Sequence, residues 1–406
     1  MKSEQIKKTI FLLGLIILFG LPALPTNLKA IGVAFFALVT IFTLKGEKFK
    51  FNTSHAIYFS LFYLFLLVSF FYTENKGYGL KKLETMSSLL FFPIIVSIIP
   101  KKYLTLIIEK KRLLLSVYVF VIVFINIAFF IYHFGHYKET LVTHYITVIR
   151  IAQDGYNIHP IYMSMHLGLS LLFCFYLIGK EDKLKHKVLI GFLAIMLLFF
   201  LFLLLKKGPI IAFFIGLLVY VIFQRERKTW ILFVALCILS FMSVLFVPKL
   251  KSKFVELTKI ETIDEGDKTS TNIRYSVSKY VIKMIRKAPV FGHGVGDSRD
   301  ELNKTYKDNE FLYSVKHNSH NQYLGVLAMC GIVGLILLLI LVFKSVFLSY
   351  KYNNVILAMV VVFYGFVMFT ENILEREDGV IFFSMFINIF SIISKQNNKE
   401  CKKSAY

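Results

Sequence analysis

Long apolar runs recur along almost the whole chain, and they constrain its fold more than any other feature. They are about 17 to 25 residues long, the length that an α-helix needs to cross roughly 30 Å of hydrocarbon. Of 406 residues, 57% are hydrophobic and 16% aromatic, whereas a soluble domain has roughly 45–50% apolar content. Strand-length alternation is absent, which disfavours a membrane β-barrel. We therefore expect an all-α, polytopic membrane helix bundle.

The apolar runs predict about twelve transmembrane helices. Their approximate bounds are 9–25, 29–44, 55–72, 84–99, 113–134, 160–178, 188–205, 208–223, 229–247, 319–343, 354–371 and 378–394. The first run follows three lysines but lacks a small-residue cleavage site, so we interpret it as a retained helix and not a secretory signal. We divide the chain into helices one to nine (1–247), a long extracytoplasmic loop with short helices and the catalytic residues (248–318), and helices ten to twelve with a cytoplasmic tail (319–406).

The distribution of Lys and Arg predicts the orientation of the bundle. With a cytoplasmic N-terminus, the inside segments carry roughly 24 of them, the short outside loops about 9 and the long loop about 14. Long loops translocate largely regardless of charge, so the excess of Lys and Arg in the short segments determines the predicted orientation. We expect a multi-pass protein of the cell (inner) membrane with both termini cytoplasmic and the long loop periplasmic. The net charge of +22 then reflects topology and attraction to anionic membrane lipids, and we expect no nucleic-acid partner.

Neither cysteines nor carboxylates indicate a metal site. Of the four cysteines, three lie in apolar runs and Cys401 lies in the tail, so no disulfide framework is implied. The long loop has an acidic patch formed by Glu261, Asp264, Glu265 and Asp267. It lies in the middle of the loop in a turn-like stretch, which favours a solvated surface. We predict no cofactor and no obligatory divalent cation.

A basic amphipathic helix is predicted in the long loop. It follows the helix-capping residues Ser270-Thr271-Asn272 and ends before Pro289. Its apolar residues are Val277, Val281, Met284 and Ile285, and its basic residues on other faces are Lys279, Lys283, Arg286 and Lys287. Such a helix is expected to lie on the membrane, and these four basic residues need no further role. Arg274, in its first turn, is the better candidate to bind a diphosphate, because a guanidinium binds phosphate oxygens in a bidentate way.

A glycine turn and a histidine-rich segment follow the basic helix. The turn is Gly292-His293-Gly294-Val295-Gly296. It lacks the strand–helix context of a nucleotide-binding motif, so it is either a plain turn or a place where Gly294 and Gly296 let backbone approach a phosphate or sugar. His320 and Asn321 then stand at a loop-to-helix junction. His320 is a candidate general base, with His317 as its competitor and Asn321 as a substrate contact, although a histidine at such a boundary can also be merely hydrogen-bonded.

The predicted topology places further features on the outer face. Lys206 and Lys207 interrupt an apolar stretch, either as lysines that snorkel at a tight helical hairpin or as cationic anchors for a phosphate. The other outer features are the loop 136–159, the lysines Lys81 and Lys82, and the segment 371–378, in which Arg376 is a further candidate for substrate binding.

The pattern as a whole resembles the bacterial O-antigen ligase and O-antigen polymerase family. The resemblance is specific over about 206–335. The matching residues are Arg274, Pro289, Gly292, Gly294, Gly296, His320, Asn321, Tyr323, Leu324, Gly331, Ile332, Gly334 and Leu335, with His159-Pro160-x-Tyr162 as a similar start of a span. One departure is that this chain has Lys206-Lys207-Gly208 where the family usually has Ser-Arg-Gly. Lys207 keeps the charge and loses the bidentate fork.

The resemblance implies a membrane glycosyltransferase. Its donor would be a glycan linked to undecaprenyl diphosphate, and its acceptor the lipid A core, a growing chain or a protein. Transfer would invert the anomeric centre without metal, with His320 similar to the proposed base and Arg274 similar to a diphosphate clamp. We expect an O-antigen ligase in lipopolysaccharide biosynthesis at the cell envelope. The alternatives are a repeat-unit polymerase, a protein O-glycosyltransferase or, in another class, a lipid-linked glycan transporter, which the near absence of ionisable residues within the spans disfavours.

Overall fold

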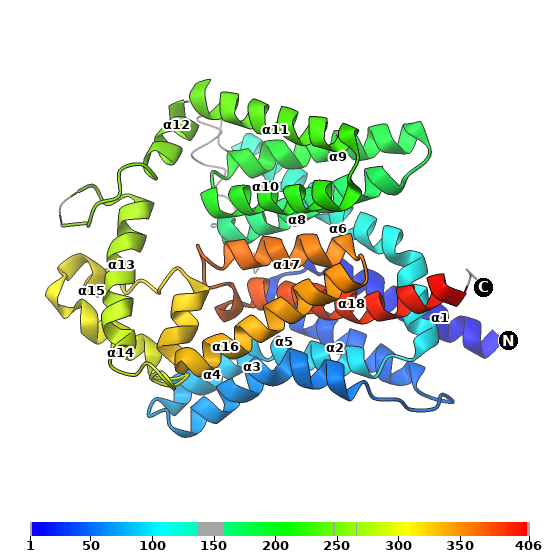
Figure 1. Cartoon of the computed structure of the whole chain (residues 1–406), viewed down its shortest axis with the longest axis horizontal. Coiled ribbons are helices and arrows are strands. Elements are labelled where there is room, and N and C mark those ends of the chain that lie inside the picture. Colours follow the sequence, from blue (N-terminus) through cyan, green and yellow to red (C-terminus); the bar gives the residue numbers. More distant parts are fainter. Residues whose placement is uncertain (1, 137–157, 247, 265, 404–406) are drawn as a thin grey trace.

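The structure is a computed structural model that describes residues 2–136, 158–246, 248–264 and 266–403. Every regular element in these ranges is a helix, which confirms the all-α prediction. The helices form a bundle of roughly aligned rods, and a lobe of short helices projects from one end of it (Figure 1).

The helix bounds follow the apolar runs. The helices before the long loop are α1 (Lys2–Phe19), α2 (Thr26–Thr43), α3 (Thr53–Phe71), α4 (Lys76–Met86), α5 (Ser88–Ser97), α6 (Lys101–His136), α8 (Pro160–Lys180), α9 (Leu184–Leu203), α10 (Lys207–Gln224) and α11 (Arg227–Phe246). The long loop contains α12 (Pro248–Val255), α13 (Ser270–Ile285), α14 (Ser298–Thr305) and α15 (Glu310–Val315). The last helices are α16 (Gln322–Lys351), α17 (Val355–Val367) and α18 (Glu377–Lys403), and the short 3-10 helices are η1 (Leu21–Ala23), η2 (Tyr306–Asp308) and η3 (Ile373–Glu375).

Within the described residues, eight helices are long and apolar enough to cross a membrane. They are α3, α6, α8, α9, α10, α11, α16 and α18, and two more helices, α2 and α17, are apolar but shorter. The predicted count of about twelve spans is therefore not confirmed. The apolar helices do support a membrane protein.

The predicted span 84–99 is not one helix. α4 ends at Met86, and α5 covers only 10 residues with Pro93 inside it. A helix rises 1.5 Å per residue, so α5 reaches about 15 Å, half of the roughly 30 Å of hydrocarbon. The prediction that this run is helical is confirmed, but a break at Ser87 divides it into two shorter helices.

The predicted span 319–343 is also interrupted, by a kink in α16. Gly331 has φ +60° and ψ −163°, which are not helical values. The glycine turn docks into this break. The amides of His293 and Gly294 donate to the carbonyls of Ala328 (3.0 Å) and Met329 (2.9 Å), and the amide of Ile332 donates to the carbonyl of Pro289 (2.9 Å). The turn thus satisfies backbone groups that the kink removes from the helical ladder.

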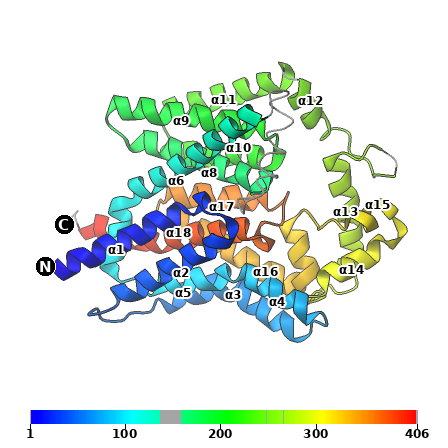
Figure 2. The same ribbon diagram turned by 180° about the vertical axis from the view of Figure 1, so that it is seen from behind.

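Burial separates central helices from peripheral ones. In α8 and α18, 89% of the apolar window is buried inside the protein, whereas no residue of α11 is buried. α18 packs against α5, α6 and α17, and α8 packs against α6, α9 and α10. α11 lies at the margin of the bundle beside α9 and α10 in both views (Figures 1 and 2). A helix with an apolar surface and no protein cover is expected to face lipid.

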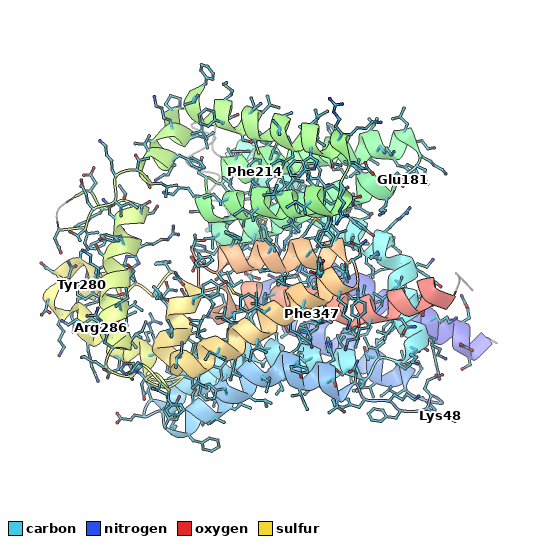
Figure 3. The ribbon with its side chains drawn as sticks, in the orientation of Figure 1. Lys48, Glu181, Phe214, Tyr280, Arg286 and Phe347 are labelled. Atoms are coloured by element: carbon cyan, nitrogen blue, oxygen red, sulfur yellow. The ribbon has the colours of Figure 1, made fainter. Side chains whose placement is uncertain are left out.

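The lobe of α12–α15 and the described ends of the chain lie at opposite ends of the molecule (Figure 2). In the lobe, the apolar residues of α13, which are Val277, Val281 and Met284, pack in a small core with Leu302, Tyr306 and Ala328. The expectation that this face of the basic helix lies on the membrane is therefore wrong, because protein covers it. Figure 3 shows Tyr280 and Arg286 at the lobe, and Lys48 and Glu181 at the opposite end.

Candidate functional site

The turn that carries His320 is held in an unusual backbone conformation. His320 has φ +45°, a left-handed value that residues other than glycine adopt infrequently and often at functional sites. Its amide donates to Oδ1 of Asn318 (3.2 Å). The next residue, Asn321, caps α16, because its Oδ1 accepts from the amides of Tyr323 (3.0 Å) and Leu324 (3.1 Å). Capping is thus a structural role for Asn321. Contact of Asn321 with substrate stays a prediction.

The same turn is tied to the segment between α17 and α18. The amide of Gln322 donates to the carbonyl of Met368 (2.8 Å), and its side-chain Oε1 accepts from the amide of Leu374 (2.8 Å). Ser319 bonds to the side chain of Asn372. Two segments that lie some 50 residues apart in the sequence therefore form one rigid unit, and this unit brings a carboxylate to His320.

That carboxylate is Glu371, which the sequence analysis did not single out. Its Oε2 lies 3.5 Å from Nδ1 of His320, and Nε2 of His320 lies 3.5 Å from Nδ1 of His317. The side chain of Glu371 is 11% exposed and that of His320 is 24% exposed. These contacts are long for hydrogen bonds, as catalytic contacts often are before substrate binds. With Glu371 accepting from Nδ1, a neutral His320 carries its basic lone pair on Nε2.

Charge around Glu371 keeps it ionised. Burial works against the charged form, but the hydrogen bond from His320 and the charges of His320, Arg274 and His159 outweigh burial, so the pKa of Glu371 lies below its usual value. The pKa of His317 is lowered, mainly by burial and further by the charge of His320, which favours its neutral form near pH 7. The cluster therefore joins an anionic carboxylate to a neutral His317 through His320.

Arg274, in α13, lies within electrostatic range of the same carboxylate. The N-cap of this helix is Thr269, whose side chain accepts from the amide of Asn272 (3.2 Å). The N-cap therefore lies one to three residues before the predicted capping residues Ser270-Thr271-Asn272, which lie in the first turn of the helix. Burial lowers the pKa of Arg274, and the nearby carboxylates of Glu371 and Glu256 oppose that decrease. The guanidinium is half-buried and, across the part of the chain that the structure describes, makes neither a hydrogen bond nor an ion pair. Its donors are thus open to a ligand.

Lys207 lies near Arg274 but is already paired. Its Nζ donates to Oε2 of Glu256 (3.0 Å) and to Oγ1 of Thr271 (2.9 Å), and its side chain is only 8% exposed. Lys253 binds the other oxygen of the same carboxylate (2.8 Å). Lys206 is the N-cap residue of α10. The predicted cationic anchor is therefore part of an ionic contact that joins α10, α12 and α13.

The glycine turn has a packing role that the sequence did not reveal. A Cβ on Gly292 would lie 2.5 Å from the amide nitrogen of Cys330, and one on Gly294 or Gly296 would lie 2.3 Å from Oγ1 of Thr73 or 2.2 Å from the carbonyl of Asn75. The close approach that these glycines allow is thus to the protein itself. Contact of Gly294 and Gly296 with a substrate stays a prediction.

The remaining predicted features are dispersed. Arg376 is exposed after η3 and lies within electrostatic range of Tyr162 in α8. Lys82 pairs with Glu375, which braces the segment that carries Glu371. Lys279 and Lys283 line an open hollow of about 340 Å³ on the face of α13 away from Arg274. The interior of the predicted loop 136–159 and Glu265 of the acidic patch lie outside the described residues.

Part of the chain, which includes most of the candidate site, matches a known protein family. Residues 191–339 match a family model described as O-antigen ligase. The chain contains an O-antigen ligase domain. The match confirms the resemblance that the motifs indicated, and it covers Lys207, Arg274, His317 and His320, while Glu371 and Arg376 lie beyond it. A search of curated proteins found no match.

The match relates residues 191–339 to a group of membrane glycan ligases and polymerases. This supports an enzyme with glycosyltransferase function, whose partners are in general a lipid-linked glycan and its acceptor. The signal that could have located Glu371 is its position directly after an apolar run on the predicted outer face. No spacing rule, however, pairs it with a histidine that lies 51 positions before it.

Proposed function

We propose that the protein transfers a glycan from an undecaprenyl-diphosphate carrier to an acceptor hydroxyl on the periplasmic face of the inner membrane, most simply as an O-antigen ligase. The observation that carries the proposal is the convergence of His320, Glu371 and Arg274 at one end of the bundle. A base, its carboxylate partner and a cation that is unpaired within the described residues are the groups that such a transfer needs. The predicted extracytoplasmic position of 248–318 and the cytoplasmic termini belong to this proposal.

Arg274 binds the diphosphate in this mechanism. Each charge-assisted hydrogen bond from its guanidinium contributes roughly 1.5 to 3 kcal/mol, and the positive charge stabilises the phosphate oxygen that gains an electron pair as the glycosidic bond breaks. Lys207 can add to this contact only if the diphosphate shares it with Glu256 or displaces that carboxylate. At the position where the family usually has arginine, this chain thus has a lysine whose counter-ion, Glu256, belongs to the same protein.

His320 activates the acceptor. Nε2 takes the proton of the acceptor hydroxyl while that oxygen bonds to the anomeric carbon and the carbon–oxygen bond to the diphosphate breaks. The proton stays on the imidazole and the bonding electrons leave with the diphosphate. Glu371 stabilises the imidazolium that forms. General base catalysis of this kind is worth typically 10²- to 10⁴-fold in rate, and a single displacement inverts the anomeric centre.

His317 is the second candidate for the base. Its Nδ1 faces His320, and its Nε2 is buried and has no hydrogen-bond partner within the described ranges. The contact of His320 with Glu371 favours His320, because only that imidazole has a carboxylate to stabilise its charged form. His317 then orients His320 or receives its proton.

Ligase, repeat-unit polymerase and protein O-glycosyltransferase use the same chemistry and differ in acceptor. Deletion of the gene separates them: loss of glycan on the lipid anchor indicates a ligase, and loss of chain length with single units retained indicates a polymerase. We propose further that the reaction needs neither a divalent cation nor a cofactor. A transporter remains the alternative of another class, and turnover of lipid-linked glycan by purified protein in detergent would exclude it as the whole function.

The direct test uses His320→Ala and Arg274→Ala in purified protein with a lipid-linked glycan and acceptor. Both should abolish transfer while insertion and yield stay normal. Arg286→Ala, which removes an exposed arginine at the other end of α13, and His186→Ala, at the opposite end of the bundle, are the matched controls. Transfer retained in both site variants would exclude the assignment.

A further inference from the structure

A cavity of about 260 Å³ lies at the end of the bundle opposite the lobe of α12–α15. Polar side chains from three helices line it: Lys111 of α6, Tyr176 and Lys180 of α8, and Gln224 of α10. Ile108 and Phe223 contribute apolar surface to the same cavity. It is separate from the candidate site, and most of its lining lies outside the O-antigen ligase domain.

The wall of the cavity between α16 and α17 is fixed. Asn353 has φ +48°, so the chain turns sharply there. Asn354 caps α17 and its Nδ2 donates to the carbonyl of Phe390 (3.1 Å) and to Oγ of Ser394 (2.7 Å). These bonds join the turn to α18, so hydrogen bonds between helices hold this wall of the cavity in place.

The charge of the cavity is positive. The Nζ of Lys111 lies 5.5 Å from the centre of the Tyr176 ring, and Tyr176 itself is buried. Among the residues that the structure describes, neither Lys111 nor Lys180 forms an ion pair. The adjacent carboxylate, Glu181, is occupied by His186 (3.4 Å) and by the amides of Asp182 and Lys183. Two cations from different helices therefore line one cavity, and neither is paired with a carboxylate of the described ranges.

The position of the cavity indicates what it binds. Lys180 and Gln224 are the last residues of two spanning helices, so the cavity lies where headgroups meet hydrocarbon. Its volume is slightly below the roughly 300–1,000 Å³ of pockets for drug-sized ligands, which suits a headgroup. Lysines near the surface of a membrane attract anionic lipids, and the apolar residues that line the cavity suit acyl chains.

We propose that this cavity binds the phosphate headgroup of an anionic phospholipid in the leaflet on this side of the membrane. Lys111 and Lys180 hold the phosphate from two helices, and Ile108 and Phe223 contact the first methylenes of the chains. A bound lipid joins α6, α8 and α10 to the α16–α17 turn. The proposal does not depend on glycan transfer at the other end of the molecule.

Native mass spectrometry of the full-length protein in detergent tests this proposal. Phosphatidylglycerol is titrated against phosphatidylcholine, and we expect one phosphatidylglycerol to stay bound preferentially. Since a basic residue near the surface contributes about 1 kcal/mol, the double variant Lys111→Gln/Lys180→Gln should weaken that binding by about 30-fold. The variant Lys111→Arg/Lys180→Arg should restore it.

The matched control is Lys101→Gln/Lys185→Gln, which removes the same charge from exposed positions on α6 and α9. It should leave the bound phosphatidylglycerol in place, and an equal loss in both double variants would overturn the proposal as general surface attraction. Equal retention of the two lipids by wild-type protein would overturn it without any variant. Full displacement of the lipid by millimolar inorganic phosphate would assign the cavity to a free anion instead.

Discussion

Two carboxylate–imidazole pairs lie at opposite ends of the bundle, and their geometry is nearly the same. Glu371 lies 3.5 Å from Nδ1 of His320 at the lobe end, and Glu181 lies 3.4 Å from Nδ1 of His186 at the other end. The side chains of the first pair are 11% and 24% exposed, and those of the second are 24% and 46% exposed. Distance alone therefore does not distinguish a site from a surface contact.

The surroundings of the two glutamates differ. The pKa of Glu181 is lowered first by the amide of Lys183, which is a local backbone contact. Burial opposes that decrease, and the contact with His186 contributes less than either. The pKa of Glu371 is lowered against strong burial by side chains from three other parts of the chain, His320, Arg274 and His159. At the candidate site, side chains from distant parts of the chain converge on a buried charge. The predictions that compare Glu371→Gln with Glu181→Gln test that difference.

The largest effect is expected from Glu371→Gln. The amide cannot stabilise an imidazolium, so the transfer rate should fall by roughly 100-fold or more with little change in KM. Glu181→Gln removes the carboxylate of the exposed pair and should leave the rate within about twofold. Steady-state kinetics on the two purified variants measures both. Similar rates for the two would show that the lobe pair is only structural.

A smaller effect is expected from Glu256→Gln. This change releases Lys207 from its counter-ion, so Lys207 can bind the diphosphate, and the KM for the lipid-linked donor should fall by about tenfold, or roughly 1.4 kcal/mol. Glu301→Gln, which breaks the exposed pair with Lys304, is the control. If the donor KM rises or stays the same in Glu256→Gln, Lys207 serves only to join α10, α12 and α13.

The smallest effect concerns stability at acid pH. Because the pKa of Glu371 is lower in the folded protein than its ordinary 4.5, its contribution is present above pH 4.5 and is lost as the pH falls through the folded value. The melting temperature of Glu371→Gln should therefore decrease less than that of wild type as the pH falls below 4.5. Glu181→Gln should follow wild type more closely, because solvent screens the exposed pair. An identical response of both variants would contradict the difference in burial.

The sequence was sufficient to predict the structural features that depend on local patterns. Apolar runs predicted an all-helical fold, the capping residues before Arg274 placed the start of α13 within three residues, and the motifs over 206–335 led to the family that the O-antigen ligase domain confirms. Such features are set by periodicity and by neighbours within a few positions.

The sequence was insufficient where distant segments meet. The kink at Gly331 depends on the turn at 289–294, which supplies the replacement hydrogen bonds. The protein cover on the apolar face of α13 comes from α14, η2 and α16. The pairing of Glu371 with His320, and of Glu256 with Lys207, crosses about 50 positions in each case. A single sequence has no periodic signal for such contacts, since they arise only when the helices pack.

The most direct test of the central claim is a structure of the protein with an undecaprenyl-diphosphate glycan bound. We expect the diphosphate oxygens within hydrogen-bond distance of the Arg274 guanidinium, and the anomeric carbon on the side that Nε2 of His320 faces. A diphosphate bound elsewhere, with Arg274 and His320 both out of contact with the donor, would contradict the account.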